Sequence, residues 1–173
     1  MLYKITCNSP VGTLTIVSSE THIKGLWIEG QKHFCSTLRE TPQYGEHIAV
    51  LQDVKNWLTD YFAGKNPSTQ ALPLDPEGTA FQKRVWQFLS AIPYGETVTY
   101  GQAAKALSCK SARAVGCAVG RNPISILIPC HRVIGSGGSL TGYAGGLAAK
   151  SYLLQLEQGA FVSKVLQQSC HPM

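Results

Sequence analysis

The chain has 173 residues, of which 44% are hydrophobic and 14% are charged, and its formal net charge is +5. This length is enough for one large domain or two small ones. Because no apolar run is long enough for a membrane helix and no signal peptide opens the chain, we expect a cytoplasmic protein without a membrane partner.

The charge is distributed unevenly along the chain. Before Phe81 there are six basic and eight acidic residues, whereas from Phe81 onward there are nine basic and only two acidic residues. A basic C-terminal half is typical of a protein that binds a polyanion such as nucleic acid. A solvated basic surface would have the same composition.

The six cysteines are scattered and form no CxxC pair. In the absence of a signal peptide, this pattern favours reduced thiols over disulfides. The cysteines and histidines of the first 35 residues lack the spacing of a usual zinc site, so we expect no metal site there. These residues are Cys7, His22, His33 and Cys35.

Short strands are predicted first and a helix follows them. Alternating or short apolar segments predict an antiparallel hairpin or meander near residues 2–7, 14–16 and 23–28, with turn residues at 9–12. From Ile48 to Phe62 the apolar residues recur with helical spacing, and Gly64 follows. Residues 66–78 are rich in proline and polar residues, which indicates a linker and a domain boundary near residue 76.

Two helix starts in the second half have capping-box sequences. Thr79 precedes Gln82, and Thr99 precedes Gln102, so each threonine and glutamine can satisfy free backbone donors. The second of these helices is expected to run to Leu107, and a further helix should span residues 111–120 after a turn. Two short helices joined in this way have the size of a helix-turn-helix, although such pairs also occur as plain helical packing.

The helix over 111–120 is expected to be narrow. Ala112, Ala114 and Gly116 carry little or no side chain, and Arg113 is the large cation of its first turn. A narrow helix can approach a nucleic-acid backbone closely. The helix lacks the long polar side chains that read bases in the major groove. The pattern therefore favours binding to DNA of any sequence, with Arg113 filling a gap in the base stack.

A candidate nucleophile lies in the segment Pro129-Cys130-His131-Arg132-Val133. It follows the apolar run 124–128, which we expect to be a buried strand or core segment. A thiol needs a neighbouring base or positive field because the thiolate is the reactive form. Cys130 is thus a candidate nucleophile activated by His131 or by a downstream carboxylate. The alternative is a buried structural cysteine beside an ordinary histidine.

The last predicted helix carries two ionisable residues on one face. Lys150 and Glu157 share that face at helical spacing. They could form a solvated edge. If the face is instead buried against Cys130 and His131, Glu157 can orient the imidazole as the third member of a Cys-His-Glu relay.

Four segments in order resemble the 6-O-alkylguanine-DNA alkyltransferase family. They are Arg113-Ala114-Val115-Gly116, Asn122-Pro123-Ile124, the Cys130 segment and Gly142-Tyr143-Ala144-Gly145-Gly146-Leu147. The resemblance implies an α+β fold, with an N-terminal α/β roll containing an antiparallel sheet and a C-terminal winged-helix-like domain with the helix-turn-helix. It implies domains over 1–76 and 77–173.

The resemblance also implies roles for individual residues. Cys130 resembles the alkyl acceptor, His131 the base that reaches it through a water, and Glu157 the carboxylate that orients His131. Asn122 resembles the hinge residue between recognition helix and active-site strand, and Lys150 the active-site lysine. The guanine pocket would be lined by Tyr100, Val133, Tyr143, Ala144 and Gly145. The DNA would be contacted by Arg113, Tyr100, Ala112, Ala114 and Gly116.

The function implied is single-turnover DNA repair. A base inside a duplex cannot be reached, so the damaged guanine must be flipped out, and a poorly paired lesion costs less to flip. The alkyl group would move irreversibly to Cys130, because a thioether has no carbonyl for water to attack. The expected partner is double-stranded DNA containing 6-O-alkylguanine, with 4-O-alkylthymine as a further candidate. We expect a monomer without a cofactor.

Two other functions remain open at this point. A cysteine hydrolase would use Cys130 to form an acyl intermediate, but it leaves the helix-turn-helix and the charge asymmetry unexplained. A non-catalytic DNA-binding module, either a winged-helix regulator or an alkyltransferase-like lesion sensor, would not need Cys130. The agreement of several linked positions with one mechanism favours alkyl transfer.

Overall fold

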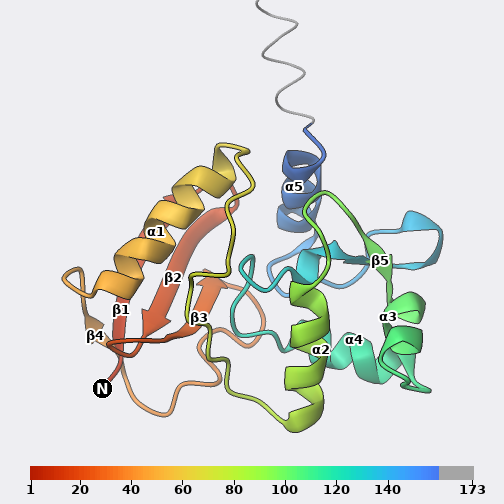
Figure 1. The fold of residues 1–173 in the computed structure, drawn as a ribbon, viewed down its shortest axis with the longest axis horizontal. Coiled ribbons are helices and arrows are strands. Elements are labelled where there is room, and N and C mark those ends of the chain that lie inside the picture. The colour runs from red at the N-terminus through yellow and green to blue at the C-terminus, as the bar shows by residue number, and fades with distance from the viewer. Residues whose placement is uncertain (160–173) are drawn as a thin grey trace, which may run out of the picture.

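The structure is a computed structural model that describes residues 1–159, with a sheet and one helix on one side and a group of helices on the other (Figure 1). Strands and helices are segregated in this way in an α+β fold, as predicted. Within the described residues, no helix is long and apolar enough to cross a membrane.

The N-terminal half is a four-stranded sheet covered by one helix. The strands β1 (Tyr3–Ser9), β2 (Gly12–Ser18), β3 (Ile23–Ile28) and β4 (Gln43–Tyr44) have the order β3-β2-β1-β4. The first three are antiparallel, as expected. The short β4 was not predicted and pairs with β1 in parallel, so the sheet is not purely antiparallel. Helix α1 (Ala49–Phe62) buries its apolar face against this sheet, as its periodicity predicted.

The segment predicted as a linker is attached to the sheet for part of its length. The Ile23 N–H donates to the Pro73 carbonyl at 2.8 Å, and the Asp75 N–H donates to the Ile23 carbonyl at 2.9 Å. Further along β3, the Leu26 N–H donates to the Pro123 carbonyl and the Ser125 N–H donates to the Leu26 carbonyl, both at 2.9 Å. The backbone hydrogen-bonding groups on the open edge of β3 therefore find partners in the linker and in the C-terminal half.

The C-terminal half contains, up to residue 159, four helices, two 3₁₀ turns and a two-stranded parallel ladder. Its elements are α2 (Ala80–Ser90), β5 (Val98–Thr99), α3 (Tyr100–Ala106), α4 (Ala112–Gly120), η1 (Cys130–Arg132), β6 (Val133–Ile134), η2 (Ser136–Gly138) and α5 (Leu147–Glu157). Both predicted capping boxes are present, at Thr79 and Thr99. Helices α3 and α4 pack against each other as the predicted helix pair.

The apolar run 124–128 is buried as a core segment, one of the two predicted alternatives, and it is not the strand that was the other. It contains only isolated bridges, and Ile126 has a φ of 72°, which breaks any extended strand. The Ile128 N–H turns back to the Ile124 carbonyl at 3.0 Å. This buried turn is possible because its polar groups find partners in itself, in β3 and in Asn122.

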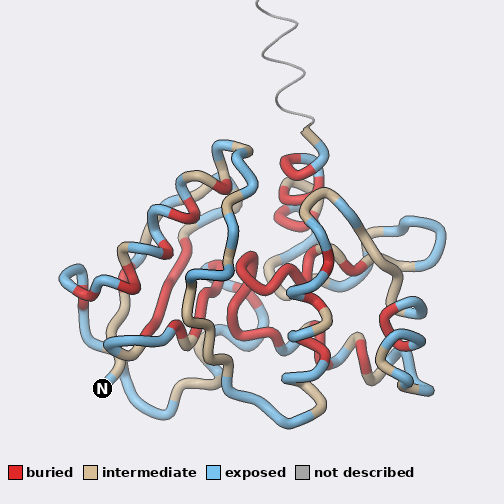
Figure 2. The backbone as a smooth tube through the Cα atoms, viewed as in Figure 1, coloured by how far each residue is buried: buried red, intermediate tan, exposed pale blue. Residues whose placement is uncertain are grey.

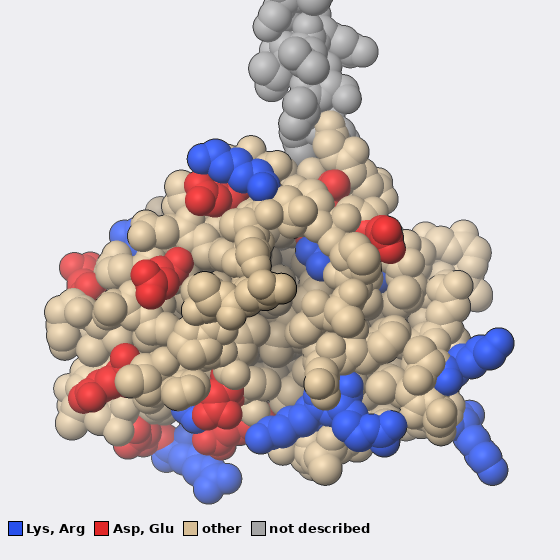
Figure 3. Space-filling view, viewed as in Figure 1, with Lys and Arg blue, Asp and Glu red and all other residues tan. Residues whose placement is uncertain are grey.

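Buried residues run through the centre of the molecule from the sheet to α2 and α5 (Figure 2). Trp86 of α2 contributes to this core and donates its indole N–H to the Ala118 carbonyl at 2.8 Å, which joins α2 to α4. On the face shown in Figure 3, acidic side chains lie mostly over the N-terminal half, while basic ones lie along the lower and right-hand edges of the C-terminal half and also at the top and bottom of the N-terminal half. The core therefore holds the two differently charged halves together.

Candidate active site

Cys130 lies at the start of η1, directly after the buried turn 124–128. It is 4% exposed. Burial raises the pKa of its thiol, while the Asn122 side chain, the Lys150 ammonium and nearby backbone N–H groups act in the opposite direction. Cys130 is therefore a buried thiol that requires a base before it can act as a nucleophile.

His131 is fully buried beside Cys130 and pairs with Glu157. Its Nε2 lies 2.6 Å from Glu157 Oε1, so the neutral ring carries its proton on Nε2 and donates it to the carboxylate. Burial lowers the pKa of His131, although Glu157 acts to raise it. Its Nδ1 has no hydrogen-bond partner among residues 1–159. A neutral imidazole with a free Nδ1 can accept a proton at that atom.

Glu157 is the centre of a buried hydrogen-bond network. Its Oε1 accepts from the Tyr61 hydroxyl at 2.7 Å, His131 Nε2 at 2.6 Å and Arg132 Nη2 at 3.0 Å. Its Oε2 accepts from Arg132 Nε at 2.9 Å and from the Gly95 N–H at 3.3 Å. Bonds from His131 and Arg132 outweigh burial and lower the pKa of Glu157 to about 2. The predicted relay of carboxylate and imidazole is thus present.

Tyr61, Arg132 and Gly95 belong to this network but were not predicted as site residues. For Arg132 the sequence offered a signal, because it directly follows His131. Its guanidinium also donates to the Ile92 carbonyl at 2.6 Å. Tyr61 and Gly95 carry no local signal, because they are separated from Glu157 by 96 and 62 positions.

Asn122 links α4 to the Cys130 segment. Its Nδ2 donates to the Ile128 carbonyl at 2.8 Å, and its Oδ1 accepts from the Ile124 N–H at 2.9 Å. One buried side chain thereby ties both ends of the turn that precedes Cys130. This is the position expected of a hinge residue between recognition helix and active-site segment.

Lys150 is also fully buried, which rules out the solvated edge considered for it and for Glu157. Its ammonium donates to the carbonyls of Val133 at 2.5 Å, Thr141 at 3.1 Å and Gly142 at 3.3 Å. Burial lowers its pKa, while the nearby Cys130 acts to raise it. Lys150 therefore holds the loop at 141–142 against the segment that carries Cys130.

Tyr100 and Tyr143 lie around the same loop. The Tyr100 hydroxyl donates to the carbonyls of Thr141 at 3.1 Å and Gly142 at 3.2 Å. The Tyr143 hydroxyl is buried without a hydrogen-bond partner in residues 1–159, and its pKa is raised by burial and by the proximity of Cys130 and Glu157. The predicted pocket residues Tyr100, Val133 and Tyr143 are thus brought together near Cys130.

Ala144 and Gly145 place the loop against the N-terminal half. The Ala144 carbonyl accepts from the Lys32 N–H at 3.1 Å. A Cβ on Gly145 would lie 2.6 Å from the Ile28 side chain, so the close approach requires glycine. The loop after η2 is therefore packed between the two halves of the chain.

Two cavities adjoin this loop and α4. One, of about 520 Å³, is lined by residues that include Tyr100, Gly116, Tyr143 and Ala144. The other, of about 500 Å³, is lined by residues that include Tyr100, Ala112, Arg113 and Gly116. Arg113 and Ala112 are exposed, whereas Ala114 and Gly116 are half-buried. Of the predicted residues, Tyr100, Tyr143, Ala144, Arg113, Ala112 and Gly116 thus line these two cavities, whereas Val133, Gly145 and Ala114 line neither.

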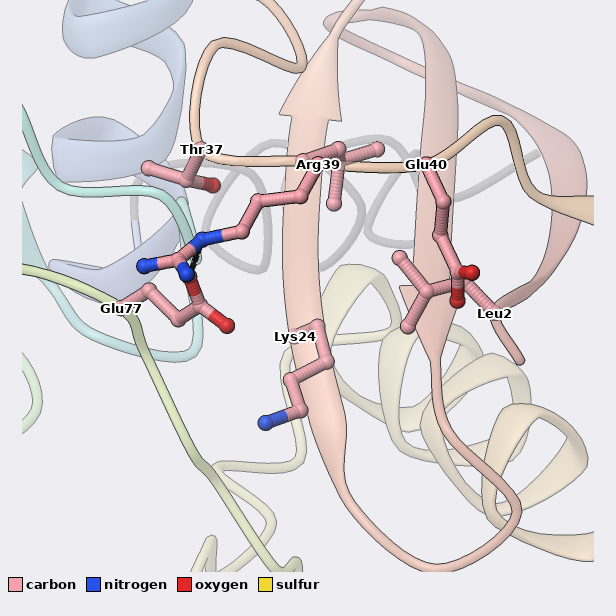
Figure 4. A pocket seen from close by; sticks show the side chains of 7 residues that line it. Leu2, Lys24, Thr37, Arg39, Glu40 and Glu77 are labelled. Carbon is pink, nitrogen blue, oxygen red and sulfur yellow. Dashed lines mark ion pairs between the residues drawn. The ribbon is translucent and has the colours of Figure 1, made fainter.

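A separate cavity of about 250 Å³ lies in the N-terminal half and does not include any of these residues (Figure 4). Charged side chains line it, and Arg39 pairs with Glu77 at 3.5 Å. Across residues 1–159, no group of three or more histidine, cysteine, aspartate or glutamate side chains could hold a metal ion.

Both halves of the chain match models of known domains. Residues 2–76 match the ribonuclease-like domain of 6-O-methylguanine DNA methyltransferase, and residues 80–159 match its DNA-binding domain.

Individual relatives are similar over nearly their whole length. The methylated-DNA–protein-cysteine methyltransferase of Haemophilus influenzae is 43% identical over 166 residues, which cover 94% of this chain and 90% of the relative. That of Methanosarcina acetivorans is 44% identical, covering 90% and 98%. The crystal structure of Mycobacterium tuberculosis OGT in complex with DNA is 42% identical, covers 91% of this chain and 93% of that chain, and has a TM-score of 0.80.

Proposed function

The chain belongs to the family of 6-O-methylguanine DNA methyltransferases, and from this premise we propose that it repairs DNA by moving an alkyl group from 6-O-alkylguanine irreversibly to its own Cys130. The observation that carries the proposal is the buried arrangement of Cys130, His131 and Glu157 beside the predicted DNA-binding helix α4. The neighbouring structure of a family member with DNA supports DNA as the partner.

DNA binding is assigned to α4 and its surroundings. The small residues Ala112, Ala114 and Gly116 let this helix approach the backbone, and the exposed Arg113 enters the duplex where the damaged base leaves it. Flipping is required because the alkylated oxygen is inaccessible within the stacked duplex. The flipped base is received by Tyr100, Val133, Tyr143, Ala144 and Gly145.

The chemical step begins with removal of a proton from Cys130. His131 takes this proton on Nδ1, through a bridging water, and Glu157 stabilises the imidazolium through Nε2. Lys150 favours the thiolate through its positive charge. Asn122 holds the turn that presents the sulfur.

Alkyl transfer is then an in-line displacement. The sulfur forms a bond to the alkyl carbon as the bond from that carbon to guanine O6 breaks, and the electron pair remains on the guanine. A proton supplied nearby, with Tyr100 as a candidate donor, neutralises the leaving base. The thioether product is not hydrolysed, so one protein molecule repairs one lesion.

The proposal extends to organisation and substrates. We assign the sheet domain to residues 1–76 and the DNA-binding, alkyl-accepting domain to 77–173. Both 6-O-alkylguanine and 4-O-alkylthymine are candidate substrates. A monomeric state and a cytoplasmic location stay predictions.

Intact-protein mass spectrometry tests the function directly. The protein is mixed with excess duplex containing 6-O-methylguanine, with Cys130→Ser and undamaged duplex as controls. We expect a gain of one methyl group on Cys130 that neither control shows. Tight binding without a mass gain would indicate a lesion sensor. Loss of many lesions per protein with unchanged mass would indicate a turnover enzyme, and either result would refute the proposal.

A further inference from the structure

The N-terminal half reaches into the buried network through one side chain. Tyr61 lies on α1, is 1% exposed, and donates its hydroxyl to Glu157 Oε1 at 2.7 Å. The same hydroxyl oxygen lies 3.4 Å from His131 Nε2. A residue of the sheet domain thus contacts both members of the relay that serves Cys130.

The ring of Tyr61 is held in place independently of its hydroxyl. It stacks on Trp57 with ring centroids 5.1 Å apart, and it meets Phe62 and Tyr94 edge-on at 5.3 and 6.2 Å. The Trp57 indole in turn donates to the carbonyls of Pro67 and Ser68, both at 3.1 Å. Because the ring is held on several sides, the hydroxyl has a defined position relative to the Glu157 carboxylate.

The hydroxyl has an electrostatic consequence for His131. A carboxylate close to an imidazole favours the imidazolium, and an imidazole that is already protonated cannot take a proton from Cys130. Each donor to Glu157 withdraws part of the negative charge from the atom that faces Nε2. The groups that face His131 or act on it are Glu157 and Lys150 of α5, Arg132 and Cys130 of η1, and Tyr61 of α1. Tyr143, in the loop before α5, acts on Glu157 and Cys130.

We propose that Tyr61 is a positioning residue for alkyl transfer, whose hydroxyl holds the Glu157 carboxylate against His131 and keeps the imidazole neutral, ready to accept the Cys130 proton. This inference rests on the proposed function. It assigns the sheet domain a part in positioning the relay, because α1 supplies the hydroxyl that donates to Glu157.

Substitution Tyr61→Phe removes the hydroxyl and leaves the ring. With one donor fewer, Glu157 Oε1 attracts the imidazolium more strongly, so we expect the pKa of His131 to rise by about one unit. The titration is followed by ¹⁵N NMR of histidine-labelled protein without DNA. The acid limb of the methyl-transfer rate should move to higher pH by the same amount, while the affinity for undamaged duplex is unchanged. Tyr3→Phe, at the half-buried start of β1 and outside the network, is the matched control and should change neither quantity.

An unchanged or lowered pKa of His131 in Tyr61→Phe would overturn the inference, even if the variant unfolds at a lower temperature, because a purely structural role predicts only the loss of stability. If the variant does not fold, the inference is tested by NMR of the wild-type protein. There, a slowly exchanging Tyr61 hydroxyl proton with a nuclear Overhauser contact to the His131 Nε2 proton is expected, and its absence would refute the inference. Neither NMR measurement uses alkylated DNA, so a wild-type protein that fails to gain a methyl group would refute the function separately.

Discussion

Replacing Glu157 with glutamine should remove a large, pH-dependent contribution to stability. The carboxylate is buried and accepts hydrogen bonds from Tyr61, His131, Arg132 and Gly95. Burial acts to raise its pKa, but the bonds and charges of His131 and Arg132 outweigh burial and lower the pKa from the ordinary 4.5 to about 2. This difference between the unfolded and folded states corresponds to roughly 3 kcal/mol at neutral pH.

The sign of this contribution follows from the lowered pKa. Since the folded protein holds the carboxylate ionised more strongly than the unfolded chain does, the stabilisation is fully present above pH 4.5 and is lost as the pH falls towards 2. At pH 3 roughly 1 kcal/mol of this stabilisation should remain. Glutamine also lowers the free energy of unfolding by an amount that does not vary with pH, because its amide N–H₂ group would face hydrogen-bond donors instead of accepting from them.

Urea unfolding, monitored by tryptophan fluorescence at several pH values, measures the difference in free energy of unfolding between the wild type and Glu157→Gln. We expect the wild type to exceed Glu157→Gln in free energy of unfolding by at least about 3 kcal/mol at pH 7, and this excess to shrink by about 2 kcal/mol at pH 3. Glu46→Gln, at an exposed glutamate, is the control and should show a small difference at every pH. A difference for Glu157→Gln that stays constant from pH 7 to pH 3 would refute the account of the buried network.

Three further substitutions test other parts of the structure. Lys150→Met removes the ammonium that favours the thiolate, so the pKa of Cys130 should rise, as measured by the pH dependence of its modification by iodoacetamide and mapped by peptide mass; an unchanged profile would contradict this role. Arg113→Ala should slow methyl transfer from duplex DNA about tenfold, with little effect on a single-stranded lesion that needs no flipping, because flipping costs a few kcal/mol; equal effects on both substrates would argue against a role in flipping. Thr99→Ala removes the side chain that accepts from the Gln102 N–H at 3.1 Å and should cost about 1 kcal/mol in urea unfolding, and no loss would show that the cap of α3 is dispensable.

Local features of the sequence were sufficient for most elements. Thr79 and Thr99 mark the starts of α2 and α3, because a capping box needs only residues three positions apart. The apolar periodicity from Ile48 to Phe62 identified α1 for the same reason, since neighbours on one helix face are set by local spacing.

The candidate nucleophile and its base could also be found in the sequence. Cys130 and His131 are adjacent, and Glu157 was linked to them by helical spacing and by family resemblance. The structure brings His131 and Glu157 into contact and buries both, as the relay required. The roles assigned to the residues of the DNA interface stay predictions.

Other features depend on contacts between segments far apart in the chain. The run 124–128 has the composition of a strand, but β3 and Asn122 satisfy its backbone as a turn. Residues 73–75 look like a linker, yet they pair with Ile23. Composition and periodicity describe a segment's own preferences, and they do not specify which edge or side chain will supply its hydrogen bonds.

The sequence by itself determined the positions of the helices, the basic character of the C-terminal half and the candidate residues for the chemistry. Only the tertiary structure decided that Tyr61 and Gly95 complete the hydrogen bonding of Glu157. That arrangement arises because α1, the chain after α2 and α5 pack around one buried carboxylate, which must find donors wherever the fold brings them.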